Sequence, residues 1–495
     1  MSVEHATTQS ARGDASYYIH VVIMLFWMFG FKYISPIAPL TKQGMAAVGI
    51  FMGLLWAWTF VDFIWPSFLG MIAVGFTGFM TVDQAFTAGF GNTTTIMVAA
   101  VFVLAAYMTS TGICKTVAYW FITRKSCIGK PYMFAFYFFL AMYILGGTAG
   151  TVASYIIGWA IVYSISELLG YQKGDAFPAV LLVGTVLSAM LGATVFPFRV
   201  FAVLVLNNAK TLVGMDCSFI VWAIPSLAAS FVAMVLFVLA IKYIFRPDVS
   251  RFVGAGDVFA QFKEELCLTK EQKVAIGVMV FIVLFASIPG FLPAGNPLKV
   301  WMAKLSIGPL IAIVLGLLYA VHKNGKPLIN YITYMKNGID WQTIVMLAAS
   351  FPVASMIQHA DSGVTTLINN VLVALLGNLG PYGIAALFII FTAVVTQVAH
   401  NLVMVIVLAP IVCNLSIVMG FNPMPCLMML AFAANCGIAT AGASVMGAML
   451  FANRTWIPTG KCFKYTWTGV IACIIGMIAL GIPLAMAMGV GTPIS

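Results

Sequence analysis

Polar residues interrupt the long apolar runs of this sequence at four places, where ion-binding chemistry is expected. The interruptions are Gly146–Ser154, Gly192–Pro197, Thr396–Leu402 and Gly437–Ser444. In lipid every backbone N–H and C=O needs a partner, so a helix that breaks there must line a protein-walled cavity. The N-terminal ends of broken helices attract anions, and their carbonyl ends attract cations. We therefore predict that the four interruptions converge on one ion-binding site near the middle of a membrane.

Two ionisable residues, Arg199 and His400, lie beside or within these interruptions. Placing an arginine at the bilayer centre costs at least about 2.5–3.5 kcal/mol, which makes Arg199 a functional candidate. His400 lies at a predicted hairpin tip, where protonation near neutral pH would change its charge. We hypothesise that both supply positive charge to an anion site. In the alternative interpretation Arg199 only extends to a headgroup or joins two helices, and His400 is a neutral hydrogen-bonding residue.

The composition is that of a chain that lies mostly in lipid. Charged residues make up 8% of the sequence, against about 25% in soluble domains, and apolar runs of bilayer length recur throughout. The net charge of +10 comes from Lys and Arg placed singly between apolar runs, which indicates the positive-inside rule rather than nucleic-acid binding. The nine cysteines form no C-x-x-C pair and the five histidines are not at ligand spacing, so neither an enzyme nor a metal centre is predicted.

The chain divides into two halves that resemble each other. The predicted organisation is a cytoplasmic segment 1–16, a first membrane half 17–245 with an inner hairpin 131–168, a cytoplasmic linker 246–273, and a second half 274–488 with an outer hairpin 381–419. Similar residues and corresponding breaks recur between the halves at offsets of 246 to 251 residues, for example the breaks at Thr151 and Asn401. Most of the 24 Lys and Arg residues fall inside when the N-terminus is cytoplasmic and the C-terminus is outside. The halves are then inverted repeats in an inner (plasma) membrane.

Several motifs resemble the divalent anion:sodium symporter family, within the larger group of ion-transporter folds. They are Leu40-Thr41-x-x-Gly44, Gly49-Ile50-Phe51, Trp58, Thr396-Gln397-Val398-Ala399-His400-Asn401-Leu402 with Pro410-Ile411, Ala193-Thr194-Val195 and Ala439-Thr440-Ala441. In that family the second hairpin tip commonly reads Thr-x-x-x-Ser-Asn-Thr, and the helix break reads Ala-Thr-Pro. The resemblance covers nearly the whole chain. It implies an all-α polytopic membrane fold with about eleven transmembrane helices, two re-entrant hairpins and inverted repeats.

The hairpin tips depart from the family pattern. Only Asn401 of the second Ser-Asn-Thr triplet is present, between His400 and Leu402, and the first triplet is replaced by Gly150-Thr151-Val152 with Ser154 nearby. Family triplets help to bind substrate carboxylates and to build sodium sites. The sequence therefore leaves three coupling modes open, namely sodium coupling, sodium-independent exchange and proton coupling.

The resemblance implies secondary transport of a small organic anion, such as a dicarboxylate, by alternating access in a homodimer. No cofactor is implied beyond Na⁺ as a possible coupling ion. Sulfate or another oxyanion is the alternative substrate. An anion channel is the alternative class of protein. The predicted substrate-binding residues are Gly150, Thr151, Ser154, Thr194, Arg199, His400, Asn401 and Thr440. The predicted ion-binding residues are Gly147, Gly192, Thr396 and Ala439. Close helix packing is the alternative role of the glycines, and capping a broken helix that of Thr194 and Thr440.

Overall fold

The computed structural model describes residues 14–127, 129–253, 267–293, 296–305, 307–323 and 325–493. Most of the predicted segment 1–16 and about half of the predicted linker 246–273 lie outside these residues. The described residues are predominantly helical and form two compact units. Unit 1 comprises 1–96 and 340–378, and unit 2 comprises 97–339 and 379–495. Each unit takes segments from both predicted halves of the chain.

Unit 1 is built on helices that pack through small residues. Its helices are α1 (Asp14–Leu25), η1 (Phe26–Gly30), η2 (Phe31–Tyr33), α2 (Lys42–Phe60), α3 (Trp65–Gly75), α4 (Val82–Phe90), α17 (Trp341–Gln358), η7 (Ala360–Ser362) and α18 (Val364–Leu376). Helix α17 packs against α3 and α4. Gly89 of α4 lies so close to the backbone of Ala348 that a side chain there would collide with the Ala348 carbonyl oxygen.

Unit 2 holds the remaining helices and two short antiparallel strand pairs. Its helices are α5 (Thr93–Ser110, continuing from unit 1), α6 (Ile113–Ile122), α7 (Pro131–Thr148), α8 (Thr151–Leu168), α9 (Ala176–Ala193), α10 (Val200–Asn208), η3 (Ala209–Val213), α11 (Phe219–Ala240), η4 (Ile241–Phe245), α12 (Ser250–Val253), α13 (Lys270–Ser287), η6 (Ile288–Gly290), α14 (Pro297–Lys304), α15 (Ile307–Ala320), α16 (Tyr331–Gly338), α19 (Pro381–Val395), α20 (Asn401–Met419), α21 (Met424–Ala434), α22 (Val445–Ala452), α23 (Thr459–Gly476), η8 (Met477–Gly481) and α24 (Ile482–Ala487). Strand β1 (Met215–Asp216) pairs with β4 (Thr492–Pro493), and β2 (His322–Lys323) pairs with β3 (Lys326–Pro327).

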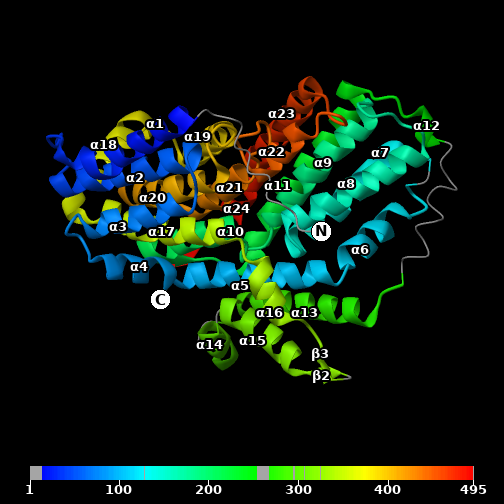
Figure 1. Ribbon diagram of the computed structural model, residues 1–495, viewed down its shortest axis with the longest axis horizontal. Coiled ribbons are helices and arrows are strands. Elements are labelled where there is room, and N and C mark those ends of the chain that lie inside the picture. Colours follow the sequence, from blue (N-terminus) through cyan, green and yellow to red (C-terminus); the bar gives the residue numbers. More distant parts are fainter. Residues whose placement is uncertain are drawn as a thin grey trace. The chain divides into compact units, whose positions relative to one another are not determined.

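The core of unit 2 is formed around two helices that are apolar on all sides. Every residue of α9 from Phe177 onwards is buried, and so is every residue of α21. A helix that is apolar all round belongs in an interior rather than at a surface. Helices α7 and α8 pack along α9 (Figure 1), and α19 and α20 pack along α21. Each of these two central helices ends at one of the predicted breaks.

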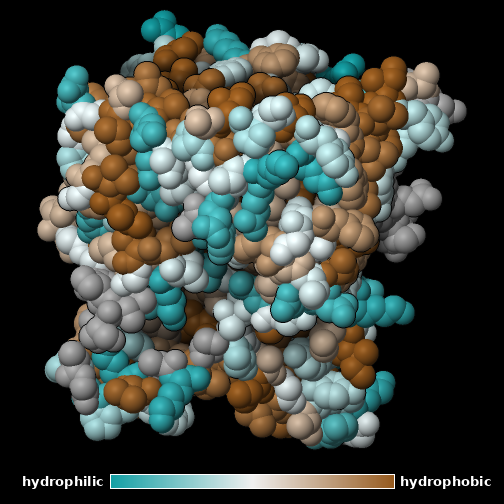
Figure 2. All heavy atoms as spheres, turned by 90° about the vertical axis from the view of Figure 1, so that its left-hand side faces the viewer, coloured by the Kyte–Doolittle hydropathy of each residue, from teal (hydrophilic) through white to brown (hydrophobic). Residues whose placement is uncertain are grey.

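The fold is that of an all-α polytopic membrane protein, as predicted. Nine helices of the described residues are long and apolar enough to cross a bilayer, or ten if the pair α18 and α19 counts as one span. The predicted number was about eleven; α3 and α15 were included in it but are shorter than 18 residues. The helix bounds of α7–α8 and α19–α20 coincide with the predicted hairpins 131–168 and 381–419. Figure 2 shows extensive apolar surface, as expected for side chains that face acyl chains.

Close contact between α11 and α23 gives a test of the packing. Gly476→Ala is expected to lower the free energy of unfolding by about 1–3 kcal/mol through overpacking, because the new Cβ would collide with the carbonyl oxygen of Ala229. Thermal unfolding of the detergent-purified protein measures the effect. Gly277→Ala in α13 is the control, since its Cβ meets nothing within 4 Å. A Gly476→Ala protein as stable as the parent would contradict this packing.

Candidate functional site

The tip of the predicted inner hairpin 131–168 (the inner tip) presents a helix N-terminus without a side-chain cap. Gly150 joins α7 to α8 with φ +100°, a conformation that favours glycine, and Thr109 of α5 donates a hydrogen bond to the Ala149 carbonyl at 3.3 Å. The first backbone hydrogen bond of α8 runs from the Ser154 N–H to the Gly150 carbonyl, at 3.2 Å. Within the described part of the chain, the N–H groups of 151–153 have no acceptor. They form the positive end of an 18-residue helix.

Arg199 lies at this tip. It ends the break between α9 and α10, and its Nη2 donates a hydrogen bond to the Gly146 carbonyl oxygen in the last turn of α7, at 3.1 Å. The same nitrogen lies 3.8 Å from the position that a Cβ on Gly150 would take. Among the described residues no carboxylate pairs with this guanidinium. A fixed positive charge and the open N-terminus of α8 therefore lie side by side, which is an arrangement for binding an anion.

The other predicted residues of the first half pack or cap helices around this tip. A Cβ on Gly147 would lie 2.8 Å from the Gly192 carbonyl oxygen, and one on Gly192 would collide with the Tyr143 carbonyl. These two glycines let α7 and α9 approach closely, and their ion-binding role stays a prediction. The hydroxyls of Thr194 and Ser154 donate to carbonyls of their own helices at 2.7 and 2.6 Å. Each hydroxyl oxygen can still accept a hydrogen bond.

The tip of the predicted outer hairpin 381–419 is joined to the second break, Gly437–Ser444, by Gln397, which the sequence analysis did not single out. Its Nε2 donates to the carbonyls of Ala393 at 2.7 Å and Cys436 at 3.1 Å. Its Oε1 accepts hydrogen bonds from the N–H groups of Ile438 and Ala439, at 3.1 and 2.8 Å. The side chain is 1% exposed. One buried amide thus satisfies four backbone groups at this tip and break.

The predicted residues of the second half complete this network. Thr440 donates its hydroxyl to the Gln397 carbonyl, and Thr396 donates to the Ala434 carbonyl at 3.3 Å. The N–H of Asn401 donates to the Ala443 carbonyl at 3.2 Å. The N–H of Leu402 donates to Asn401 Oδ1 at 2.9 Å and reaches His400 Nδ1 at 3.4 Å. The structure therefore brings Thr396, Ala439, Thr440 and Asn401 together in one hydrogen-bonded cluster.

The two halves differ in how their broken helices begin. In the second half α20 and α22 have side-chain caps, from His400 and Ser444. In the first half α8 and α10 have none. The second cluster, formed by Thr396, Gln397, Asn401, Ala439 and Thr440, thus uses its polar groups internally. The first cluster, formed by the tip at Gly150 with Arg199 and Thr194, leaves N–H groups available beside Arg199. This asymmetry identifies the inner tip as the better candidate for the charged end of an anion.

The two clusters belong to the same unit. Asn435, at the start of the second break, donates to the Met190 carbonyl of α9 at 2.5 Å. Helix α10 packs against α20 and α21, and Asn453 after α22 donates to Tyr163 of α8 at 2.7 Å. Gln397 and Asn435 are the residues that sequence reasoning missed. Their signal was available, because each is a polar residue inside a long apolar run.

Comparisons with known proteins agree with this architecture. The profile of the sodium:sulfate symporter transmembrane region matches residues 45–489. The sodium-dependent dicarboxylate transporter SdcS of Staphylococcus saprophyticus is 24% identical over 63% of this chain and 61% of its own length. SdcS of Staphylococcus aureus is 23% identical over 56% of this chain and 53% of its own length. The chain therefore matches only about half to three fifths of these relatives.

Two solved transporter structures share the fold. The YdaH transporter of Alcanivorax borkumensis has a TM-score of 0.55 at 14% identity, over 82% of this chain and 87% of that one. MtrF of Neisseria gonorrhoeae, described with a class of antimetabolite efflux pumps, has a TM-score of 0.57 at 13% identity, over 94% of both chains. At such low identity these two likenesses establish the fold alone.

The amide of Gln397 gives a direct test of the second cluster. Gln397→Leu is expected to lower the free energy of unfolding by about 2–5 kcal/mol, because buried N–H and C=O groups lose their partners. Thermal unfolding in detergent measures it. Gln342→Leu, at an exposed glutamine at the start of α17, is the matched control and should change stability by less than about 0.5 kcal/mol. Equal stability of both variants would contradict the role of the Gln397 amide in satisfying these backbone groups.

Proposed function

The chain belongs to the sodium:sulfate symporter family, and on this premise we propose that it is a secondary transporter of small organic anions, with dicarboxylates as the leading substrate class. The family is the one that the sequence motifs resembled. The substrate class comes from the names of the SdcS relatives and from the chemistry of the inner tip. Sulfate or another oxyanion is the alternative substrate.

The observation that carries the proposal is Arg199 beside the uncapped N-terminus of α8. A carboxylate accepts hydrogen bonds from a guanidinium and from backbone N–H groups, and such charge-assisted bonds are about twice as strong as neutral ones. The free N–H groups of 151–153 and Arg199 Nη2 are of the right kind for one carboxylate. The hydroxyls of Thr151 and Thr194 are polar groups of the same tip and break. We assign this position to one carboxylate of the substrate.

Alternating access is the mechanism that we propose for this site. Both polar clusters lie within unit 2, so a movement of this unit as one body would carry the whole site. Buried backbone groups at the breaks are held by Gln397 and Asn435, which favours rigid movement over local unfolding. An inner (plasma) membrane location, a cytoplasmic N-terminus and a homodimer remain part of the proposal.

Sodium-independent exchange is a second candidate for the coupling mode, and a specific observation favours it. The Gly146 carbonyl, at the negative end of α7, accepts a hydrogen bond from Arg199, and the Cys436 carbonyl of the second break accepts one from Gln397. Such carbonyls are the groups by which broken helices coordinate Na⁺. Side-chain donors thus take up one lone pair of each, and Arg199 adds a positive charge of its own.

Counterflow in proteoliposomes tests transport. Unlabelled succinate on the inside is expected to accelerate uptake of labelled succinate, as in a carrier, whereas a channel would show no such trans-stimulation. Arg199→Gln keeps a hydrogen-bond donor but removes the charge, and should weaken apparent affinity by about 10–100-fold. Arg454→Gln, at an exposed arginine of unit 2, is the control. Full affinity in Arg199→Gln would refute the assigned carboxylate position.

Replacing sodium by choline tests the coupling mode in the same vesicles. If the charge of Arg199 substitutes for a bound cation, exchange rates in the two salts should agree within about twofold, which corresponds to less than 0.5 kcal/mol. A proton gradient imposed across the vesicle provides the third arm. Uptake that sodium accelerates more than about tenfold would eliminate the sodium-independent mode, and acceleration by the proton gradient alone would establish proton coupling instead.

A further inference from the structure

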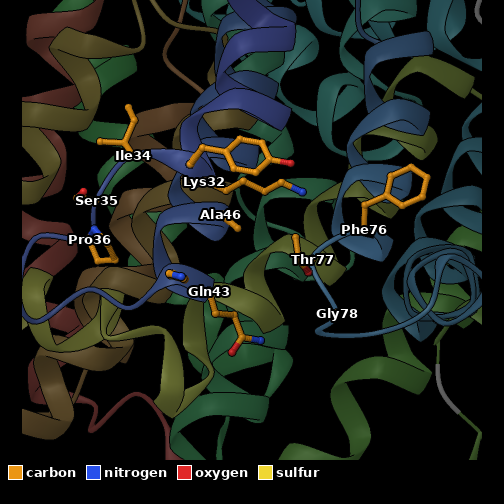
Figure 3. Close-up of a pocket in the computed structure, with 11 residues that line it drawn as sticks. Lys32, Ile34, Ser35, Pro36, Gln43, Ala46, Phe76, Thr77 and Gly78 are labelled. Atoms are coloured by element: carbon orange, nitrogen blue, oxygen red, sulfur yellow. The ribbon is translucent and has the colours of Figure 1, made fainter.

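Unit 1 contains a groove that the proposed transport site does not involve (Figure 3). The groove has a volume of about 680 Å³, within the range of about 300–1,000 Å³ that is usual for small-molecule sites. Its walls come from the end of the first span, the start of α2 and the turn after α3. They include Lys32, Lys42, Gln43, Phe76 and Thr77.

The groove is positively charged. Lys32 extends across it towards the side of Phe76 and Thr77 (Figure 3), and Lys42 is the first residue of α2. The first turn of α2 has no acidic residue, so Lys42 adds its charge to the positive end of the helix. In the described ranges neither lysine forms a salt bridge, and the carboxylate of the nearby Asp361 lies 3.7 Å from His359 Nδ1. A lysine at a helix N-terminus is electrostatically unfavourable, and a bound anion would offset this cost.

The groove lies where spans end. Residues 15–33 and 42–60 are each long and apolar enough to cross a bilayer, and the segment 34–41 connects them. The segment and the groove are therefore placed at the level of the lipid headgroups. Large apolar side chains are exposed at and beside the groove, with Tyr33 82%, Phe76 64% and Ile37 70% exposed. Cationic groups beside exposed aromatic residues are typical of a protein surface at the membrane interface.

The base of the groove is rigid. Thr41 accepts a hydrogen bond from the Gly44 N–H at 3.1 Å and donates its hydroxyl to the Asp361 carbonyl at 2.6 Å. The Thr41 N–H donates to the Ser362 carbonyl at 3.2 Å. A Cβ on Gly44 would collide with that same carbonyl oxygen. The start of α2 is thus fixed against η7, which holds Lys42 in place.

We propose that this groove binds the phosphate headgroup of an anionic phospholipid. Lys32 and Lys42 contact the phosphate, Gln43 offers hydrogen bonds to the headgroup alcohol, and Phe76 contacts the glycerol and upper acyl region. A free phosphate ion would use the lysines but leave the exposed apolar groups in water. The combination of charge, exposed apolar surface and membrane depth favours the lipid.

Titration calorimetry of the protein in a neutral detergent tests this site with short-chain phosphatidylglycerol. Lys32→Gln and Lys42→Gln should each weaken binding about fivefold, and the double variant about 25-fold, as expected for lysines near anionic headgroups. The double Lys→Arg variant keeps both charges and should bind nearly as tightly as the parent. Lys304→Gln, at an exposed lysine of α14, is the matched control.

Two further titrations distinguish the source of the anion. Phosphatidylcholine, which carries no net charge, and inorganic phosphate should both bind more than about tenfold more weakly than phosphatidylglycerol. Phosphate that binds as tightly as the lipid would make the ligand a free anion and would overturn the lipid assignment. Unchanged phosphatidylglycerol binding in the double Lys→Gln variant would overturn the assignment of the lipid site to this groove. Thermal unfolding of each variant distinguishes a loss of binding from a loss of folding.

Discussion

The need to satisfy backbone groups inside a membrane determines most of this structure. A helix broken in hydrocarbon exposes N–H and C=O groups, each of which costs several kcal/mol if it finds no partner. Unit 2 meets this demand at its second break with side chains: Gln397 and Asn435 are buried and bonded to backbone. The two central helices that lead into the breaks are buried on all sides, so water from the surface cannot do the same work. The polar residues of the second cluster therefore have a structural role, which is to satisfy the backbone groups at the break.

The first cluster satisfies only some of the backbone groups at its helix ends, and this leaves N–H groups available to bind a ligand. Arg199 satisfies the C-terminal carbonyl of Gly146, but the N-terminus of α8 beside it stays uncapped. The sequence predicts that the two clusters occupy corresponding positions of an inverted repeat, yet one is closed by a neutral amide and the other is left with a positive charge. A substrate anion would supply the acceptors that the protein itself withholds.

Much of this was predictable from the sequence, because lipid imposes simple rules on it. The family resemblance was confirmed over residues 45–489, and the helix bounds of 131–168 and 381–419 follow from Pro131, Pro381 and the glycine or polar residues at the tips. Gln397 was visible as a polar residue, but its role could not be read from the pattern, since three of its four partners come from a segment about 40 residues later. The hydrogen bond from Arg199 to Gly146 likewise joins residues 53 positions apart. The binding roles of Gly147, Gly192 and Ala439 stay predictions, because close packing and backbone hydrogen bonds already account for their positions.

The fixed charge of Arg199 at the inner tip affects whether the protein catalyses exchange or net uptake. A bound Na⁺ can dissociate on either side of the membrane, so an empty carrier need not keep its charge. Arg199 is covalently fixed and remains protonated under ordinary conditions. An empty unit 2 would therefore have to carry an unpaired guanidinium through the membrane, which is costly, whereas a bound carboxylate neutralises it. On the proposed function, unit 2 moves between its two access states more easily with substrate bound than empty. This difference is the physical basis of exchange as opposed to net uptake.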